Sequence, residues 1–102
     1  MTVYIPPDYF RLQKPPSVIA SGSFTYDNTA GASDYVAPLA SGECMAVLIR
    51  VVSGSCYIGG YDRQDFPLSQ GDTIAVSIDK LDKLHVRVPA GASVTLAWLA
   101  VG

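Results

Sequence analysis

Short runs of β-favouring residues, each ended by Gly, Pro, Asp or Ser, occupy the chain from residue 17 onward. No amphipathic helical pattern separates these runs, so the strands they predict are joined by turns rather than by crossover helices. The sequence therefore predicts an all-β fold, an antiparallel β-sandwich or jelly-roll-like barrel of about seven strands. The predicted strands are 18–26, 34–39, 44–52, 55–58, 73–78, 84–88 and 93–101.

The two cysteines lie in consecutive predicted strands. Ser53-Gly54 has the composition of a tight turn, which predicts a hairpin of 44–52 with 55–58. In that hairpin Cys44 and Cys56 lie too far apart along the ladder to form a disulfide. Their spacing matches no zinc pattern either. We therefore expect two buried free thiols.

The predicted strands show two kinds of hydrophobic pattern. Residues 73–78 and 84–88 alternate apolar with polar side chains, which predicts one buried and one solvated face. Residues 44–52 and 94–101 are apolar on both faces, which suggests a further layer outside the core. On these two strands we expect Leu48 and Trp98 at an interface, with the core as the other possible place for Trp98.

Composition supports burial against a partner. Hydrophobic residues make up 49% of the 102 residues and charged residues 16%, against about 25% charged residues in an average domain. A partner chain or tightly packed strands would each accommodate this surplus. The net charge of −2 and the lack of a basic run argue against nucleic acid and anionic membranes as partners. No signal peptide or membrane span is expected.

Residues 1–16 differ from the rest and are predicted to form an extended arm before a β-sandwich domain at 17–102. Two proline pairs, at 6–7 and 15–16, favour extended chain. Aromatic and aliphatic side chains between them are unlike a disordered tail. The arm is expected to lie on its own domain or, as we favour, on a neighbouring subunit. The residues expected to make this contact are Tyr4, Ile5, Pro6, Pro7, Tyr9, Phe10 and Leu12.

No catalytic, cofactor or metal site is predicted, and we expect no enzyme. His85 is the one histidine, and strand alternation places it on a solvated face rather than beside other functional groups. The chain has neither a Gly-x-Ser-x-Gly motif nor a phosphate-binding loop. A loop tip around Gly59 and Gly60 offers a possible carbohydrate-binding platform. Its candidate residues are Tyr57, Tyr61, Asp62 and Arg63.

Three segments resemble small structural proteins of tailed bacteriophages. They are Tyr57-Ile58-Gly59-Gly60, residues 66–74 (FPLSQGDTI) and residues 78–86 (IDKLDKLHV). The resemblance covers most of 21–99 and not the arm. It implies a β-sandwich in the virion, either a head-decoration (cement) protein or a minor head or tail component. The implied partners are the major capsid protein or another virion protein, together with further copies of this chain, for which we expect a trimer.

The turn at 71–74 (GDTI) also occurs in cupins, which hold a metal with clustered histidines and a glutamate. This chain has a single histidine, His85, and a single glutamate, Glu43. A cupin-like enzyme is therefore not expected. The sequence favours a virion assembly protein that acts through its arm and apolar strand faces, and a carbohydrate- or surface-binding module is the alternative.

Overall fold

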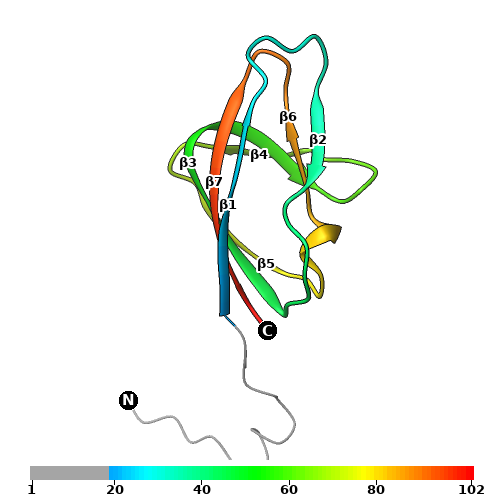
Figure 1. Cartoon of the computed structure of the whole chain (residues 1–102), viewed down its shortest axis with the longest axis vertical. Coiled ribbons are helices and arrows are strands. Elements are labelled where there is room, and N and C mark those ends of the chain that lie inside the picture. The colour runs from blue at the N-terminus through cyan, green and yellow to red at the C-terminus, as the bar shows by residue number, and fades with distance from the viewer. Residues whose placement is uncertain (1–18) are drawn as a thin grey trace, which may run out of the picture.

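The structure, a computed structural model, describes residues 19–102 and is all-β, as the sequence predicts (Figure 1). Seven antiparallel strands and one short 3₁₀ turn make up the described part. The strands are β1 (Ile19–Asp27), β2 (Tyr35–Pro38), β3 (Ala46–Gly59), β4 (Phe66–Ser69), β5 (Thr73–Ser77), β6 (His85–Val88) and β7 (Ser93–Val101). The 3₁₀ turn, η1 (Leu81–Lys83), lies in the connection from β5 to β6.

The long strand β3 belongs to two layers. Its first half pairs with β7 and β5, and β7 pairs in turn with β1; we call these four sheet A. Its second half pairs with β4 and β6, and β6 pairs with β2; we call these four sheet B. Figure 1 shows β3 curving from one layer into the other. The two layers are therefore one sheet folded over on itself.

The predicted hairpin at Ser53-Gly54 is wrong, because the chain continues through these residues as one strand. The register between β3 and β7 shifts between Val51 and Ser53, and pairing resumes with Ser53 opposite Thr95 and Gly54 opposite Val94. Gly54 has a positive φ of 80°. A Cβ at this position would lie 1.9 Å from the carbonyl oxygen of Ser93. Glycine is thus required for a bulge and a close approach to β7, not for a chain reversal.

The strand β4 is absent from the sequence prediction. It is four residues long and contains Pro67, a residue that argues against a strand. Pro67 is tolerated because β4 pairs only with β3 among the described residues and so forms an edge. The structure adds β4 and merges two predicted strands into β3, so the number of strands in residues 19–102 is still seven.

The core lies between sheet A and sheet B. In β6 the predicted alternation is confirmed, since Val86 and Val88 are fully buried. In β3 and β7 one set of alternate side chains points inward and is buried. The core residues are Leu39, Cys44, Val47, Ile49, Val51, Cys56, Ile58, Leu68, Leu81, Leu84, Val86, Val88, Val94, Leu96 and Ala100.

Both cysteines are buried and free, as predicted, although the hairpin used to separate them does not exist. Cys56 lies within β3 and is 1% exposed. Cys44 precedes that strand, and its thiol donates a hydrogen bond to the carbonyl oxygen of Ile78 at 3.0 Å.

Within residues 19–102, no helix is long and apolar enough to cross a bilayer.

Candidate functional surfaces

The outer face of sheet A carries a group of exposed aliphatic side chains. Residues opposite one another in a ladder share a face, and the register places Leu48 opposite Leu99 and Ile19 opposite Val101. Ile19, Leu48 and Leu99 are 72%, 44% and 41% exposed. Val52 follows on β3 and is 51% exposed. We call these four residues, with Ala97 and Val101, the apolar face.

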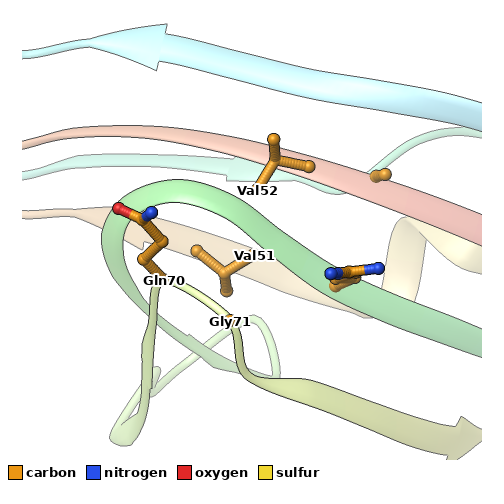
Figure 2. Close-up of a pocket in the computed structure, with 6 residues that line it drawn as sticks. Val51, Val52, Gln70 and Gly71 are labelled. Atoms are coloured by element: carbon orange, nitrogen blue, oxygen red, sulfur yellow. The ribbon is translucent and has the colours of Figure 1, made fainter.

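Beside the apolar face lies a hollow of about 380 Å³ where β3 bends. Figure 2 shows Val51 and Val52 on the curved part of β3, with Gln70 and Gly71 on the neighbouring turn. This turn is fixed to the bend, because the amide of Gly71 donates to the carbonyl oxygen of Val51 at 2.9 Å. Arg50 and Ala97 complete the lining. Arg50 is exposed and forms no ion pair within residues 19–102.

The two strand residues expected at an interface lie on opposite sides of sheet A. Leu48 belongs to the apolar face. Trp98 is opposite the buried Ile49 in the register and packs against the core. Its indole fills the space beside Gly22, where a Cβ would lie 2.6 Å from the ring. Trp98 is therefore a core-side residue of β7, the alternative left open by the sequence. The expected contact residues between Tyr4 and Leu12 lie outside the described residues.

The outer face of sheet B is organised around Arg87. Its guanidinium carbon lies 4.2 Å from the ring centroid of Tyr57, directly opposite on β3. Its Nε and Nη2 donate to the backbone oxygen of Gln64 at 3.1 and 2.8 Å. Its Nη1 forms an ion pair with Asp34 at 3.1 Å. Arg87 thus attaches both the 60–65 loop and the start of β2 to the sheet.

The 60–65 loop holds Tyr61 against His85. Gln64 is 6% exposed, and its side-chain amide donates to the backbone oxygens of Gly60 and Tyr61 at 2.7 and 3.0 Å. Tyr61 is 81% exposed. It lies edge-on to the imidazole of His85, with a centroid distance of 5.5 Å and an interplanar angle of 82°. The loop is therefore ordered by internal hydrogen bonds while its aromatic side chain faces solvent.

Sequence alternation predicts a solvated His85, and this prediction is wrong in part. The side chain is on the outward face of β6, yet it is only half-exposed because Tyr61 covers it. Its Nδ1 is buried and has no hydrogen-bond partner among the described residues. The alternation gave the correct face of the strand but could not show that a loop folds back over it.

A second hollow, of about 460 Å³, lies between Tyr61 and strand β2. Pro38 is opposite His85 in the register of β2 with β6, so the two residues share this face. The hollow is lined by Val36, Pro38, Tyr61, Asp62, Gln64 and His85. Of the four predicted ligand residues, Tyr61 and Asp62 line it. Tyr57 lies under Arg87 instead, and Arg63 pairs with Asp65 at 2.9 Å.

Four lining residues were not among the predicted ligand residues: Val36, Pro38, Gln64 and His85. Val36 and Pro38 come from β2, at the far edge of sheet B, and reach the loop only through the pairing of β2 with β6. A single sequence contains no signal for that pairing. Gln64 had a weak signal, as a polar residue inside a glycine-rich loop.

Carboxylates on the surface act mainly in turns. The amide of Ala90 and the guanidinium of Arg87 both donate to Asp34 and lower the pKa of its carboxyl group. The side-chain and backbone hydrogen bonds from Thr29 likewise lower the pKa of Asp27. Asp72 caps its own turn by accepting a hydrogen bond from the amide of Ser69 at 2.8 Å.

Within residues 19–102, no group of three or more His, Cys, Asp or Glu side chains is placed to hold a metal ion.

Comparison with known proteins gives no family for this chain. No family model and no curated protein matches it. A cupin superfamily protein from Desulfitobacterium hafniense is similar in structure, with 12% sequence identity and a TM-score of 0.45. The alignment covers 87% of this chain and 82% of that chain. A likeness of this size carries no argument about function.

Proposed function

We propose that this protein is a non-catalytic assembly protein, a decoration (cement) protein of a bacteriophage head. Its copies associate through the apolar face of sheet A. The observation that carries the proposal is this face, where Leu48 and Leu99 lie opposite one another and remain more than two-fifths exposed. Large aliphatic side chains gathered on one side of a sheet are costly to leave in water and are typical of interaction sites.

The occupant that we propose for the apolar face is another copy of this chain. Arg50 is the one charged residue among the outward-facing positions of β3 and β7, so the face offers little to a strongly charged partner. An apolar face is complementary to a second apolar face, and every copy brings one. A neighbouring edge supports the same occupant, since β1 pairs only with β7 within the described residues. From Ile19 to Tyr26 that edge contains no proline and no charge, the features that usually prevent strand addition.

Residues 1–16 complete the proposal as the element that attaches each copy to the capsid or another virion protein. Their paired prolines and aromatic side chains suit an extended clamp. The first described residue, Ile19, belongs to the apolar face. The sequence resemblance to phage structural proteins supports the virion as the location. Many modest contacts of this kind give firm attachment through multivalency.

The mass of the full chain in solution tests the self-association. We expect a discrete oligomer, which we propose is a trimer, and conversion to monomer by the double substitution Leu48→Ser and Leu99→Ser. Both side chains point away from the core, so the variant should stay folded. Val36→Ser is the matched control, because Val36 is also 44% exposed but lies on sheet B. A monomeric wild-type chain, or an oligomer unaffected by the double substitution, would rule the proposed interface out.

Deletion of residues 1–16 tests the attachment. We expect the shortened chain to keep its β-sheet circular dichroism spectrum and to lose binding to phage heads stripped of their decoration protein. Undiminished binding by the shortened chain would show that the sandwich itself makes the attachment.

A further inference from the structure

We propose that the hollow between Tyr61 and strand β2 is a binding site for a neutral carbohydrate. The site is on the outer face of sheet B and is therefore separate from the apolar face. It consists of the Tyr61 ring on one side, Pro38 and Val36 on the other, and His85 between them. Asp62 provides a carboxylate at its margin.

The loop that presents Tyr61 is held in place by hydrogen bonds. An exposed tyrosine on a loose loop would need no explanation, but this loop is fixed by two sets of hydrogen bonds. Gln64 donates hydrogen bonds to the backbone of Gly60 and Tyr61, and Arg87 holds the backbone oxygen of Gln64. Gly59 allows the loop to pack closely, since a Cβ there would lie 2.1 Å from the oxygen of Arg63. The aromatic surface is therefore pre-organised, which lowers the entropy lost on binding.

Two polar groups beside the Tyr61 ring have unused hydrogen-bonding capacity within residues 19–102. The Nδ1 of His85 has no partner among residues 19–102, an uncommon state for a buried polar atom. The carboxylate of Asp62 forms no ion pair or hydrogen bond with any other residue of 19–102, whereas its neighbours Arg63 and Asp65 pair with each other. An aromatic wall next to a free carboxylate can serve both kinds of surface of a sugar ring. The C–H face packs on Tyr61, and the hydroxyls donate to Asp62; the Nδ1 of His85 has no exposed surface and joins them only if the Tyr61 ring shifts on binding.

The charge of the lining favours a neutral ligand. Among the described lining residues there is one carboxylate and no lysine or arginine. Arg87 does not serve the hollow, because its donors are taken by Gln64 and Asp34 and its face by Tyr57. The site therefore disfavours phosphate, sulfate and acidic sugars, and a neutral ring is the ligand that its chemistry accepts. Its volume of about 460 Å³ lies within the usual range for small-molecule sites.

Saturation-transfer difference NMR on the full-length protein tests this site. The probes are the methyl glycosides of glucose, galactose, mannose and N-acetylglucosamine. We expect transfer to at least one of them, with amide shifts confined to the 60–65 loop, β2 and β6. Tyr61→Ala should weaken binding at least about tenfold, which corresponds to about 1.4 kcal/mol, and Tyr61→Phe should retain it.

Phe66→Ala is the control, because Phe66 is another exposed aromatic residue, 56% exposed, that does not line the hollow. It should bind the same glycoside as the wild type does. The oligomeric mass should be the same for Tyr61→Ala and the wild type, which keeps this test apart from that of the apolar face. Absence of transfer to all four glycosides, or equal transfer to Tyr61→Ala, would overturn the proposal.

Discussion

At the scale of single residues, the thiol of Cys56 shows how burial changes chemistry. Burial raises the pKa of this thiol from 9.0 to about 11, since the low-dielectric interior disfavours the thiolate. The thiolate is also the reactive form. Cys56 is therefore a packing residue of β3, and its reactivity is suppressed as long as the sandwich stays closed.

The raised pKa predicts a loss of stability at alkaline pH. Unfolding returns the Cys56 pKa to its ordinary value, so the stabilisation is complete below pH 9 and is lost as the pH rises toward 11. Two pKa units correspond to about 2–3 kcal/mol of unfolding free energy. We expect urea denaturation of Cys56→Ala to show a smaller decline over this range than the wild type. Cys44 and all other titrating groups are common to both proteins, so parallel declines would contradict the prediction.

Tyr61 and His85 show which parts of a site a sequence can reveal. Tyr61 and Asp62 were predicted as ligand residues because an aromatic and a carboxylate beside two glycines suggest an exposed loop tip. His85 was predicted to be solvated because alternation describes a strand and not what lies over it. Its contact with Tyr61 depends on the return of the loop across sheet B, which is a long-range feature.

At the scale of elements, the long strand β3 decides the architecture. Strands of both sheets pair with β3, and the bend in β3 sets the position of sheet A relative to sheet B. A Ser-Gly pair between two apolar runs has the same local composition in a hairpin turn and in a bulge. The sequence predicted the runs on either side correctly, but only the partner strand β7 determines that the chain goes straight on.

Gly54→Ala is the substitution that tests this bend. The backbone has a positive φ at Gly54, and the added methyl group would overlap the carbonyl oxygen of Ser93. We expect the free energy of unfolding to fall by at least about 1–3 kcal/mol, the usual cost of such strain, measured by urea denaturation. Gly60→Ala is the control, because a Cβ there meets nothing within 4 Å and its φ is not in the positive range. Similar small losses in both variants would show that the bend tolerates a side chain.

Edge strands account for the other difference between prediction and structure. Proline within a short apolar run argues against a strand, yet β4 accommodates Pro67 and β2 accommodates Pro38 at the edges of sheet B. The run that contains Pro38 is predicted as a strand, and the four residues Phe66–Ser69 are not. Sequence patterns therefore predicted β1, β2, β5, β6 and β7, divided the central strand β3 in two, and missed the proline-containing edge strand β4.

At the scale of the whole molecule, the self-association proposed for the apolar face would make thermal stability depend on protein concentration. An oligomer that dissociates on unfolding is stabilised by mass action. We expect the midpoint of thermal unfolding to rise by several degrees over a hundredfold concentration series, equivalent to about 1–3 kcal/mol. The Leu48→Ser and Leu99→Ser double variant should show a flat series, with Val36→Ser rising like the wild type. A flat wild-type series would argue against a self-associating protein.

The pairing of β1 with β7 has a mechanical consequence. Ile19 lies opposite Val101, so both ends of the described chain leave the sandwich at the same end, as Figure 1 shows. Tension applied between residues 19 and 101 would pull these two strands apart like a zipper, loading their hydrogen bonds one pair at a time. Tension between residue 19 and the far tip of the molecule would instead load all the rungs of the ladder together in shear. The direction of pulling, and not the number of hydrogen bonds, would then decide how much force the domain withstands.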